Sequence, residues 1–515
     1  MEARILWADD EIDLLKPHIL FLEEKGFTID TVNNGSDAVE MSRENHYDII
    51  FLDENMPGLT GLETLSKIKE SNSSVPIIMI TKSEEEHIME EAIGGQISDY
   101  LIKPVNPNQI LLSLKKNLDS KDLVSQKTTS DYQMEFRQIG MQLNDRLNAK
   151  EWTDVYDKLV KWELKLEDSR DDGMKEVFAM QKKDANTQFC RYIDNNYRAW
   201  LQGDEAAPLL SHKLLSERLM PRLGKEPIFL LVIDNLRYDQ WKVLQPMISE
   251  FFNVDKEELF YSILPTATHY ARNALFAGLM PLEIEKKHPN LWLNENEEGG
   301  KNMHEEELLQ ANLDRHGKRD IKMSYNKVIK LDFAKRLVDR FNELTKNDLN
   351  VVVYNFVDML SHARTEMEVI KELADDEPAY RSLTVSWFNH SPLKELLKKI
   401  AQQGIKTIIT TDHGTIRVDN PVKVQGDKNT NTNLRYKVGK NLNYNEKEVI
   451  ISSNPEDIML PKENVSSQFI FSKETDFFAY PNNYNYYVNY YKDTFQHGGV
   501  SLEEMIIPWV ELSPK

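Results

Sequence analysis

Short apolar runs alternate with amphipathic segments over the first 118 residues. The runs have the length of buried strands and lie at residues 3–8, 27–32, 47–53, 75–81 and 97–104. Between them apolar positions recur at helical spacing, and a last helix is expected near Asn106 to Leu118. Strands that alternate with helices at this spacing form a doubly wound parallel sheet. The pattern therefore predicts an α/β domain over residues 1–119.

The pattern changes after residue 119. Residues 120–222 show long helical spacing with few glycines and helix-start signals at Ser130 and Thr153, so we expect a helical bundle or connector. Strand-like runs then return, interleaved with helical segments, at residues 228–234, 351–358, 405–414 and 506–512. They predict a second, larger α/β domain over residues 223–515.

Charge and cysteine content narrow the classes of function. The 515 residues carry a net charge of -21, which argues that the molecule as a whole does not bind DNA or an anionic membrane electrostatically. Cys190 is the single cysteine, so a disulfide framework and a cysteine-rich zinc site are excluded and any metal must use Asp, Glu, His or hydroxyl ligands. No apolar run reaches the ~18 residues of a membrane-spanning helix. We expect a cytoplasmic protein without a membrane partner.

Polar side chains follow the predicted strands of the first domain. Asp9 and Asp10 follow the first strand, and the ends of later strands carry Asp53, Thr81 and Lys103. The carboxyl ends of parallel strands meet at one crevice, so these side chains should lie together. Carboxylates hold Mg²⁺, one carboxylate can attack phosphorus, and threonine and lysine can bind phosphoryl oxygens. One such Asp is usually a turn residue or helix cap, but five coincidences in this order favour a functional site.

Through DD at residues 9–10, LDENMPG at residues 52–58 and KP at residues 103–104, the first 118 residues resemble a response-regulator receiver domain. The resemblance implies that a sensor histidine kinase phosphorylates Asp53. It also implies a Mg²⁺ ion held by Asp10 and Asp53, with Asp9 assisting and the Asn55 carbonyl as a further ligand.

The receiver resemblance also implies a switch. Thr81 and Tyr100 would be the switch pair beside Lys103, although an aromatic residue at position 100 can simply pack. Phosphorylation would produce a homodimer through the segment from about Glu84 to Leu118. The Lys103–Pro104 bond is a candidate cis peptide.

The larger domain again places polar residues after strands: Asp234, Asp358, and Asp412 with His413. Asp358 and His362 are four residues apart, so a helix that starts there projects both from one face. His497 lies in QHGG, where glycines let the backbone approach closely. Together these residues offer two ligand sets, which suits a pair of Zn²⁺-like ions at the ~4 Å separation used for in-line phosphoryl displacement.

A two-metal phosphotransferase that works through a covalent intermediate needs a hydroxyl nucleophile, and Thr268 in LPTATHYARNALFAGLMP is the candidate. This segment resembles the nucleophile loop of the alkaline phosphatase superfamily, where P-T-x-T leads into a helix that ends in G-L-x-P. With VIDNLRYDQW, VDMLSH, TTDHGT and HGGVSLEEMIIP in order, residues 222–515 resemble the PglZ branch of that superfamily.

The PglZ resemblance implies a role for each ligand. One Zn²⁺ would be held by Asp358, His362 and His497, and the other by Asp234, Thr268, Asp412 and His413. A lone histidine is more often a hydrogen-bonded core residue, but His362, His413 and His497 each adjoin an acid or a glycine in their own motifs. His269 lacks such a neighbour and is expected to be structural. Asn290 is a candidate for binding a phosphate oxygen of the substrate.

Residues 416–496 form an insertion with basic residues and six tyrosines between Tyr480 and Tyr491. Basic side chains among aromatics suit phosphates and stacked bases. The alternative is a β-rich cap whose tyrosines pack against the core, and the pattern slightly favours this alternative.

The order of receiver, helical connector and PglZ-like domain is similar to that of the response regulators associated with type IX secretion in Bacteroidetes. The resemblance implies a phosphodiesterase that acts on nucleotides or oligonucleotides, with a sigma factor as a possible further partner. Direct sequence-specific DNA binding is not expected, because no helix-turn-helix with a basic recognition helix is apparent.

The leading hypothesis is a phosphorylation-controlled phosphodiesterase with a phosphothreonine intermediate at Thr268. A phosphomonoesterase or phosphotransferase is the second hypothesis. The third is a non-catalytic docking platform for a sigma or transcription factor. All seven predicted metal ligands are chemically competent, which argues against loss of activity but not against an additional docking role.

Overall fold

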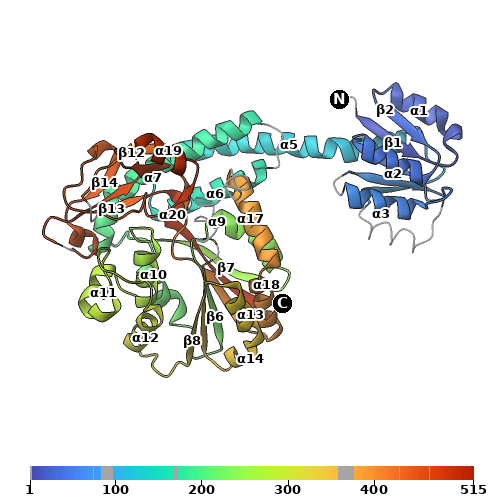
Figure 1. Cartoon of the computed structure of the whole chain (residues 1–515). Helices are drawn as coiled ribbons and strands as arrows, with labels where there is room; N and C mark the ends of the chain where they lie inside the picture. The colour runs from blue at the N-terminus through green and yellow to red at the C-terminus, as the bar shows by residue number, and fades with distance from the viewer. Residues whose placement is uncertain are drawn as a thin grey trace. The chain divides into compact units, whose positions relative to one another are not determined.

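The computed structural model describes residues 3–515 except 73–74, 83–96, 168–171, 356, 358–375, 428–429 and 463. The chain forms two compact units, Met1–Tyr132 and a larger unit that begins at Gln133 and ends at Lys515. Figure 1 shows both units with their helices and strands labelled. The predicted boundaries after residues 119 and 222 stay predictions, and the connector helices that follow α5 belong to the larger unit.

The N-terminal unit contains a parallel sheet with strand order β2-β1-β3-β4-β5. Its elements are β1 (Arg4–Ala8), η1 (Ile12–Leu15), α1 (Lys16–Glu23), β2 (Thr28–Val32), α2 (Gly35–Glu44), β3 (Ile49–Leu52), α3 (Gly61–Ser71), β4 (Ile77–Thr81), β5 (Asp99–Ile102) and the first part of α5 (Pro107–Asn144), which ends in the larger unit. This order reverses direction between β1 and β3, which places the ligand crevice of a doubly wound sheet at their carboxyl ends. The predicted fold class of this unit is confirmed.

The central strands of this sheet are buried on both faces. Along β1, Ile5 and Trp7 belong to one hydrophobic cluster, whereas Leu6 and Ala8 belong to the cluster on the opposite face. Successive side chains of a strand point to opposite faces, so a continuous apolar run is needed when helices cover both. This explains why the strands appear in the sequence as uninterrupted apolar runs.

The last helix of this region is longer than predicted. We expected an end near Leu118, but α5 continues to Asn144. No glycine or proline occurs from Asn108 to Ile139, so the sequence contains no residue there that would stop a helix.

The helix starts that we predicted at Ser130 and Thr153 are wrong, since Ser130 lies within α5 and Thr153 lies within α6 (Ala149–Glu167). The start of α6 is set instead by Asn148, whose side chain accepts from the Glu151 amide at 3.0 Å, while the Glu151 carboxylate accepts from the Asn148 amide at 2.8 Å. This reciprocal pair satisfies backbone donors that the first turn of a helix leaves without partners.

The larger unit is built on a mixed sheet with strand order β7-β18-β10-β6-β9-β8. The strands are β6 (Ile228–Ile233), β7 (Phe252–Tyr261), β8 (Met323–Val328), β9 (Leu349–Tyr354), β10 (Lys406–Thr410) and β18 (Ile506–Pro514). β10, β6, β9 and β8 are parallel, and β18 pairs antiparallel with both β10 and β7. The neighbouring strands β10, β6 and β9 therefore point their carboxyl ends at one edge.

Helices cover both faces of this sheet (Figure 1). They are α7 (Asp172–Leu201), α8 (Ser211–Leu214), η2 (Leu215–Leu219), α9 (Tyr238–Ile248), α10 (Thr268–Ala277), α11 (Pro281–Lys287), η3 (Pro289–Leu291), α12 (Glu305–Arg315), α13 (Leu331–Asp339), α14 (Phe341–Leu344), α17 (Glu377–His390), α18 (Pro392–Gln402) and α20 (Leu502–Met505), together with α6. Phe276 of α10 packs with Leu309 and Leu313 of α12. The same hydrophobic cluster contains strand residues such as Leu230 and Val351. The predicted α/β class of this domain is confirmed.

Small sheets form the insertion between β10 and α20. They pair β11 (Ile416–Arg417) with β17 (Phe495–Gln496), β12 (Asn420–Lys423) with β16 (Asp476–Ala479), and β13 (Tyr436–Gly439) with β15 (Gln468–Ser472) and β14 (Val449–Ser452). The short helices η4 (Glu446–Glu448) and η5 (Pro455–Ile458) flank β14. The insertion is β-rich as predicted, but its tyrosine segment forms a helix, α19 (Tyr484–Tyr491).

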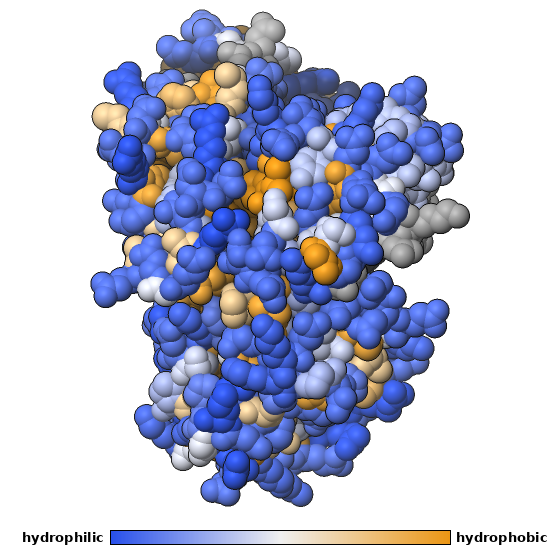
Figure 2. Space-filling model, turned by 90° about the vertical axis from the view of Figure 1, so that its left-hand side faces the viewer, coloured by the Kyte–Doolittle hydropathy of each residue, from blue (hydrophilic) through white to orange (hydrophobic). Residues whose placement is uncertain are grey.

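The face of the molecule drawn in Figure 2 is mostly hydrophilic, and its apolar residues lie in separate small patches. Within the part of the chain that the structure describes, no helix combines the length and the apolar character needed to cross a membrane.

Candidate phosphorylation and metal sites

The crevice of the N-terminal unit brings together the acidic residues that the strand ends predicted. Asp9, Asp10 and Asp53 each offer a carboxylate oxygen, and these oxygens lie within 4.8 Å of one another. The Lys103 ammonium lies 2.7 Å from Asp9 Oδ2 and 3.2 Å from Asp53 Oδ1. Three converging carboxylates fit a hard divalent cation, and a lysine at the same place fits an anion added to one of them.

Asp53 is buried at the end of β3, whereas Asp10 is exposed. Burial raises the pKa of the Asp53 carboxyl to about 6, and the nearby Lys103 ammonium acts in the opposite direction. Thr81 is buried at the end of β4, and Tyr100 lies half-buried in β5. The Lys103–Pro104 bond is cis, which confirms that prediction. The roles of Thr81, Tyr100 and the exposed Asn55 stay predictions.

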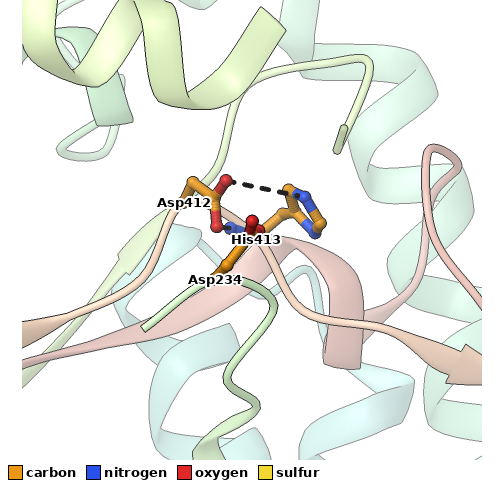
Figure 3. A group of neighbouring side chains, drawn as sticks. All are labelled: Asp234, Asp412 and His413. Atoms are coloured by element: carbon orange, nitrogen blue, oxygen red, sulfur yellow. Dashed lines mark hydrogen bonds and ion pairs between the residues drawn. The ribbon is translucent and has the colours of Figure 1, made fainter. Parts of the chain in front are cut away.

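A second acidic cluster lies at the carboxyl ends of β6 and β10. Asp234 follows β6, Asp412 and His413 follow β10, and the three side chains converge (Figure 3). All three are fully buried, and one ligand atom from each lies within 4.8 Å of the others. Two carboxylates and an imidazole form a donor set suited to Zn²⁺ or a similar ion.

Hydrogen bonds join the loop after β6 to the loop after β10, the two loops that carry this cluster. The Asn235 amide donates to Asp412 Oδ1 at 3.3 Å, and the Leu236 amide donates to Thr411 Oγ1 at 3.1 Å. Asn235 has a φ of 65°, a left-handed conformation that asparagine adopts more easily than most residues. This tight turn brings the backbone amides of the β6 loop against side chains of the β10 loop, and these hydrogen bonds help to set the separation of the carboxylates.

Thr268 reaches the same cluster from the first residue of α10. Its hydroxyl lies 3.3 Å from Asp234 Oδ1 and 3.0 Å from His413 Nε2. The structure therefore brings Asp234, Thr268 and His413 into contact, as the predicted ligand set requires. The hydroxyl also begins a helix whose first backbone amides point toward any anion bound there.

Two histidines of the site share a hydrogen-bonding arrangement. His413 Nδ1 lies 3.0 Å from the Gly414 carbonyl, and His497 Nδ1 lies 3.2 Å from the Thr266 carbonyl. A carbonyl only accepts, so each Nδ1 carries the proton and each Nε2 carries the lone pair. Metal-ligating histidines commonly donate their second ring nitrogen in this way. The two rings stack with centroids 4.3 Å apart, which places His497 beside the cluster.

Burial keeps the His413 imidazole neutral. It lowers the pKa of His413 to about 4, although Asp234 acts in the opposite direction. Burial also raises the pKa of Asp234 to about 6, against the effect of Arg272. A neutral imidazole is the form that binds a metal ion.

The QHGG segment needs its glycines, as its motif suggested. Gly498 has a φ of 122°, and a Cβ at Gly499 would lie 2.6 Å from the Ser472 carbonyl oxygen. The Gly498 amide donates to Thr266 Oγ1 at 3.1 Å, so this segment is fastened to the loop that precedes Thr268.

Arg272 is a member of the cluster that the sequence analysis missed. It is buried, its guanidinium donates to Asp234 Oδ2, and it donates to Glu305 at 2.5 Å. Its nearest distance to Asp412 Oδ2 is 3.8 Å. Its spacing could have revealed it in the sequence, because Arg272 lies four residues after Thr268 and so on the same face of α10. It places a fixed positive charge beside the two carboxylates.

The remaining predicted residues have different outcomes. Asp358 and His362 lie outside the described residues. Asn290 is exposed in η3, and its role stays a prediction. His269 stacks on Trp292, and its Nε2 lies 2.8 Å from the Leu293 carbonyl, which agrees with a structural role.

Three family descriptions match successive parts of the chain. Residues 5–115 match the response regulator receiver domain, and residues 122–201 match the PorX response regulator linker domain. Residues 215–512 match the family described as the BREX system PglZ alkaline phosphatase-like domain. The receiver match implies a phosphodonor such as a histidine kinase, and both the receiver and alkaline phosphatase-like matches generally imply metal ions.

Curated relatives match the N-terminal part. The transcriptional regulatory protein ResD of Bacillus subtilis is 35% identical over 114 residues, which are 22% of this chain and 47% of ResD. SrrA of Staphylococcus aureus is 34% identical over 115 residues, again 22% of this chain and 47% of the relative. The chain therefore spans about half the length of the curated relatives it matches.

Among solved structures, the receiver domain protein of Methanospirillum hungatei is 23% identical with a TM-score of 0.23, and the match covers 23% of this chain and 96% of that one. The chemotaxis protein CheY4 of Vibrio cholerae is 27% identical with a TM-score of 0.22, covering 23% and 100%.

Proposed function

The chain belongs to the PglZ family of alkaline phosphatase-like domains and carries a response-regulator receiver domain, and on this basis we propose that it is a phosphorylation-controlled phosphodiesterase. Its substrates would be nucleotide phosphodiesters, and its activity would depend on two Zn²⁺ ions in the larger unit and one Mg²⁺ ion in the receiver. The match of residues 122–201 to the PorX response regulator linker domain supports type IX secretion as the regulated process.

One observation carries the catalytic part of the proposal. Asp234 Oδ1 and His413 Nε2 lie within 3.3 Å of the Thr268 hydroxyl, and Asp412 lies beside them at the carboxyl end of the neighbouring strand. A hydroxyl that lies in contact with metal-ligating side chains is positioned to be activated as a nucleophile.

The ligand sets follow from the sequence prediction. Asp234, Thr268, Asp412 and His413 would hold one Zn²⁺, and His497 with Asp358 and His362 would hold the other. When bound, the two ions supply positive charge that stabilises the phosphoryl oxygens and lowers the pKa of a coordinated hydroxyl. The hydrogen-bonding arrangement of His413 and His497 supports this assignment, because both leave Nε2 as the ligand nitrogen.

The residues of the chain then perform a two-step displacement. Thr268 Oγ1 attacks phosphorus, the bond from phosphorus to one ester oxygen breaks, and the threonine proton ends on the departing alcohol. Water then breaks the phosphothreonine ester and restores the threonine hydroxyl. Arg272 holds Asp234 in position through both steps, and Asn290 is the candidate for binding a phosphate oxygen.

The receiver residues have their own roles. Asp53 would accept a phosphoryl group from a histidine kinase, with Mg²⁺ held by Asp10, Asp53 and the Asn55 carbonyl, and Asp9 assisting. Lys103 would bind a phosphoryl oxygen, since it lies 3.2 Å from Asp53. The sequence prediction that Thr81 and Tyr100 form the switch pair is retained.

The test compares hydrolysis of bis-nitrophenyl phosphate and mononitrophenyl phosphate by the wild type, Thr268→Ala and Thr268→Ser. We expect preference for the diester, about two zinc-class ions per chain by elemental analysis, and loss of turnover after chelation. Thr268→Ala should lose more than about 10³-fold in kcat, because it removes the nucleophile, and serine should restore part of it.

Thr345→Ala is the matched control, because Thr345 is half-buried, away from the candidate zinc ligands, and its hydroxyl donates to the Asn342 carbonyl. Preference for the monoester would favour a phosphatase instead. Near-normal activity of Thr268→Ala would rule out the threonine nucleophile, and inactivity of metal-loaded wild type would favour the docking hypothesis.

A further inference from the structure

The tyrosine helix α19 has two different faces. Tyr484, Val488 and Tyr491 pack against the small core that contains Val418 and Phe477. The other face carries Tyr486 and Tyr490, which are 64% and 36% exposed. Their rings are nearly parallel, with an interplanar angle of 14° and centroids 6.1 Å apart. Tyr486 and Tyr490 are not part of this packed core, so packing against it does not explain them.

The surroundings of these rings favour an anionic partner. The segment from Tyr480 to Lys492 contains no Asp or Glu, in a chain whose net charge is -21. The Lys423 ammonium lies 4.7 Å from the centre of the Tyr484 ring, and Lys492 is exposed at the end of the helix. The nearest acid in sequence, Asp493, is paired with Arg417 at 3.2 Å. Exposed aromatic rings with flanking cations are the elements of single-strand nucleic-acid binding.

The helix is also tied to the candidate zinc site. Tyr491 and His497 are six positions apart in the chain, a span of about 20 Å when fully extended. Between them, Phe495 and Gln496 form β17, which pairs with β11, and β11 begins three positions after His413. In Figure 1, α19 lies with the small strands β12 and β13, away from α13 and α14.

We propose that Tyr486 and Tyr490 of α19, with the exposed Lys492 at the end of the same helix, form a base-stacking platform for single-stranded oligonucleotides. The platform would hold bases while a phosphodiester bond of the same strand lies at the zinc site. This inference deepens the proposed function and rests on it for the link to hydrolysis. Because every base offers a π-face, binding should depend little on base sequence.

The test measures binding separately from hydrolysis. Fluorescence anisotropy with a labelled ten-nucleotide oligothymidylate is recorded on the full chain in the presence of a chelator. We expect binding that weakens with salt, and a decrease in affinity of about 5- to 150-fold for Tyr486→Leu and for Tyr490→Leu, as for loss of one stacked base. Tyr486→Trp should keep the affinity, and Lys492→Gln should lower the salt dependence.

Phe136→Leu is the matched control, because Phe136 is exposed to the same 36% but lies in α5. Its affinity should equal that of the wild type. Hydrolysis of bis-nitrophenyl phosphate should be unchanged in the Leu variants, because that small diester cannot reach a platform. Failure of this hydrolysis in the wild type would count against the proposed function alone.

Two results would overturn the platform. One is a wild type that does not bind the oligonucleotide, and the other is equal binding by folded Leu variants, as judged by circular dichroism. A change of sedimentation coefficient in the Leu variants without a change in oligonucleotide affinity would show that the rings contact another copy of the chain instead.

Discussion

At the scale of single residues, the candidate zinc site depends on a charge that is not a metal ligand. Arg272 bridges Asp234 and Glu305, and Glu305 also accepts from Tyr325 and pairs with Lys327 at 3.0 Å. The guanidinium has donors in a fixed fork, so it can bind both carboxylates at once. It therefore orients Asp234 so that Oδ1 faces Thr268.

Arg272→Gln should weaken zinc binding. The variant removes the cation between two buried carboxylates and frees Asp234 to rotate, and changes of this kind cost about 10- to 100-fold in metal affinity or activity. Arg272→Lys should recover only part, because an ammonium cannot contact both carboxylates with the same geometry. Zinc affinity is measured by competition with a chromophoric chelator.

Arg315→Gln provides the control for this measurement, because Arg315 also donates to groups next to α10 but contacts the Ala277 and Gly278 carbonyls and Asn312. Zinc affinity equal to that of the wild type in Arg272→Gln would show that Asp234 keeps its position without the guanidinium.

At the scale of elements, a buried network of ion pairs joins the connector helices to the larger α/β domain. Arg381 of α17 contacts Glu163 and Glu167 of α6 and Asp239 of α9, at 2.8 to 3.0 Å. Lys182 of α7 pairs with Glu163 at 2.8 Å and with Glu503 of α20 at 3.1 Å. Since α9 starts soon after Asp234 and α20 soon after His497, α6 and α7 are held against the elements that carry the candidate ligands.

Breaking this network should destabilise the larger unit. Arg381→Gln removes the cation that Glu163, Glu167 and Asp239 share, and loss of one partner from a buried pair costs about 3–5 kcal/mol. Arg340→Gln should shift the midpoint much less, because Arg340 is 70% exposed and its ion pair with Glu343 lies on the surface. Urea denaturation of both variants, with the midpoint of the transition as the readout, checks the difference.

A shift of the midpoint that is the same for the two variants would mean that the network stabilises no more than a surface pair. In that case α6 and α7 would be held to the α/β domain by their apolar faces.

At the scale of the whole molecule, the receiver should control pairing of chains. A phosphoryl group on Asp53 brings negative charge to a pocket where Lys103 already lies near two carboxylates, so Thr81 and Tyr100 can follow it and change the adjacent surface. We expect dimerisation through the segment from about Glu84 to Leu118, of which residues 84–96 lie outside the described residues.

Beryllofluoride mimics the acyl phosphate, so sedimentation with and without it tests this expectation. The wild-type mass should shift to that of a dimer, and Asp53→Ala should not shift, because it lacks the carboxylate. An unchanged wild-type mass, or the same shift in the alanine variant, rules out this switch.

Much of both sites could be predicted from the sequence because of one rule about parallel sheets. Asp9, Asp53, Asp234 and Asp412 each follow an apolar run, and the carboxyl ends of neighbouring parallel strands must meet at one edge. The local pattern alone therefore predicted that residues far apart in the chain lie together in two clusters. The fold class of both domains followed from the same apolar runs.

Tertiary structure decided what depends on packing between distant elements. The His413 imidazole is neutral because it is buried, and Arg272 lies between Asp234 and Glu305 because distant elements pack together. The exposed face of α19 depends on which side of the helix meets the core cluster of the insertion. Two errors were local: the capping pair at Asn148 starts α6 in place of the signal at Thr153, and α5 continues past Leu118 because no residue there stops a helix. The physical reason is that strand ends are positioned by backbone topology, whereas the environment of each side chain is positioned by contacts made only in the folded chain.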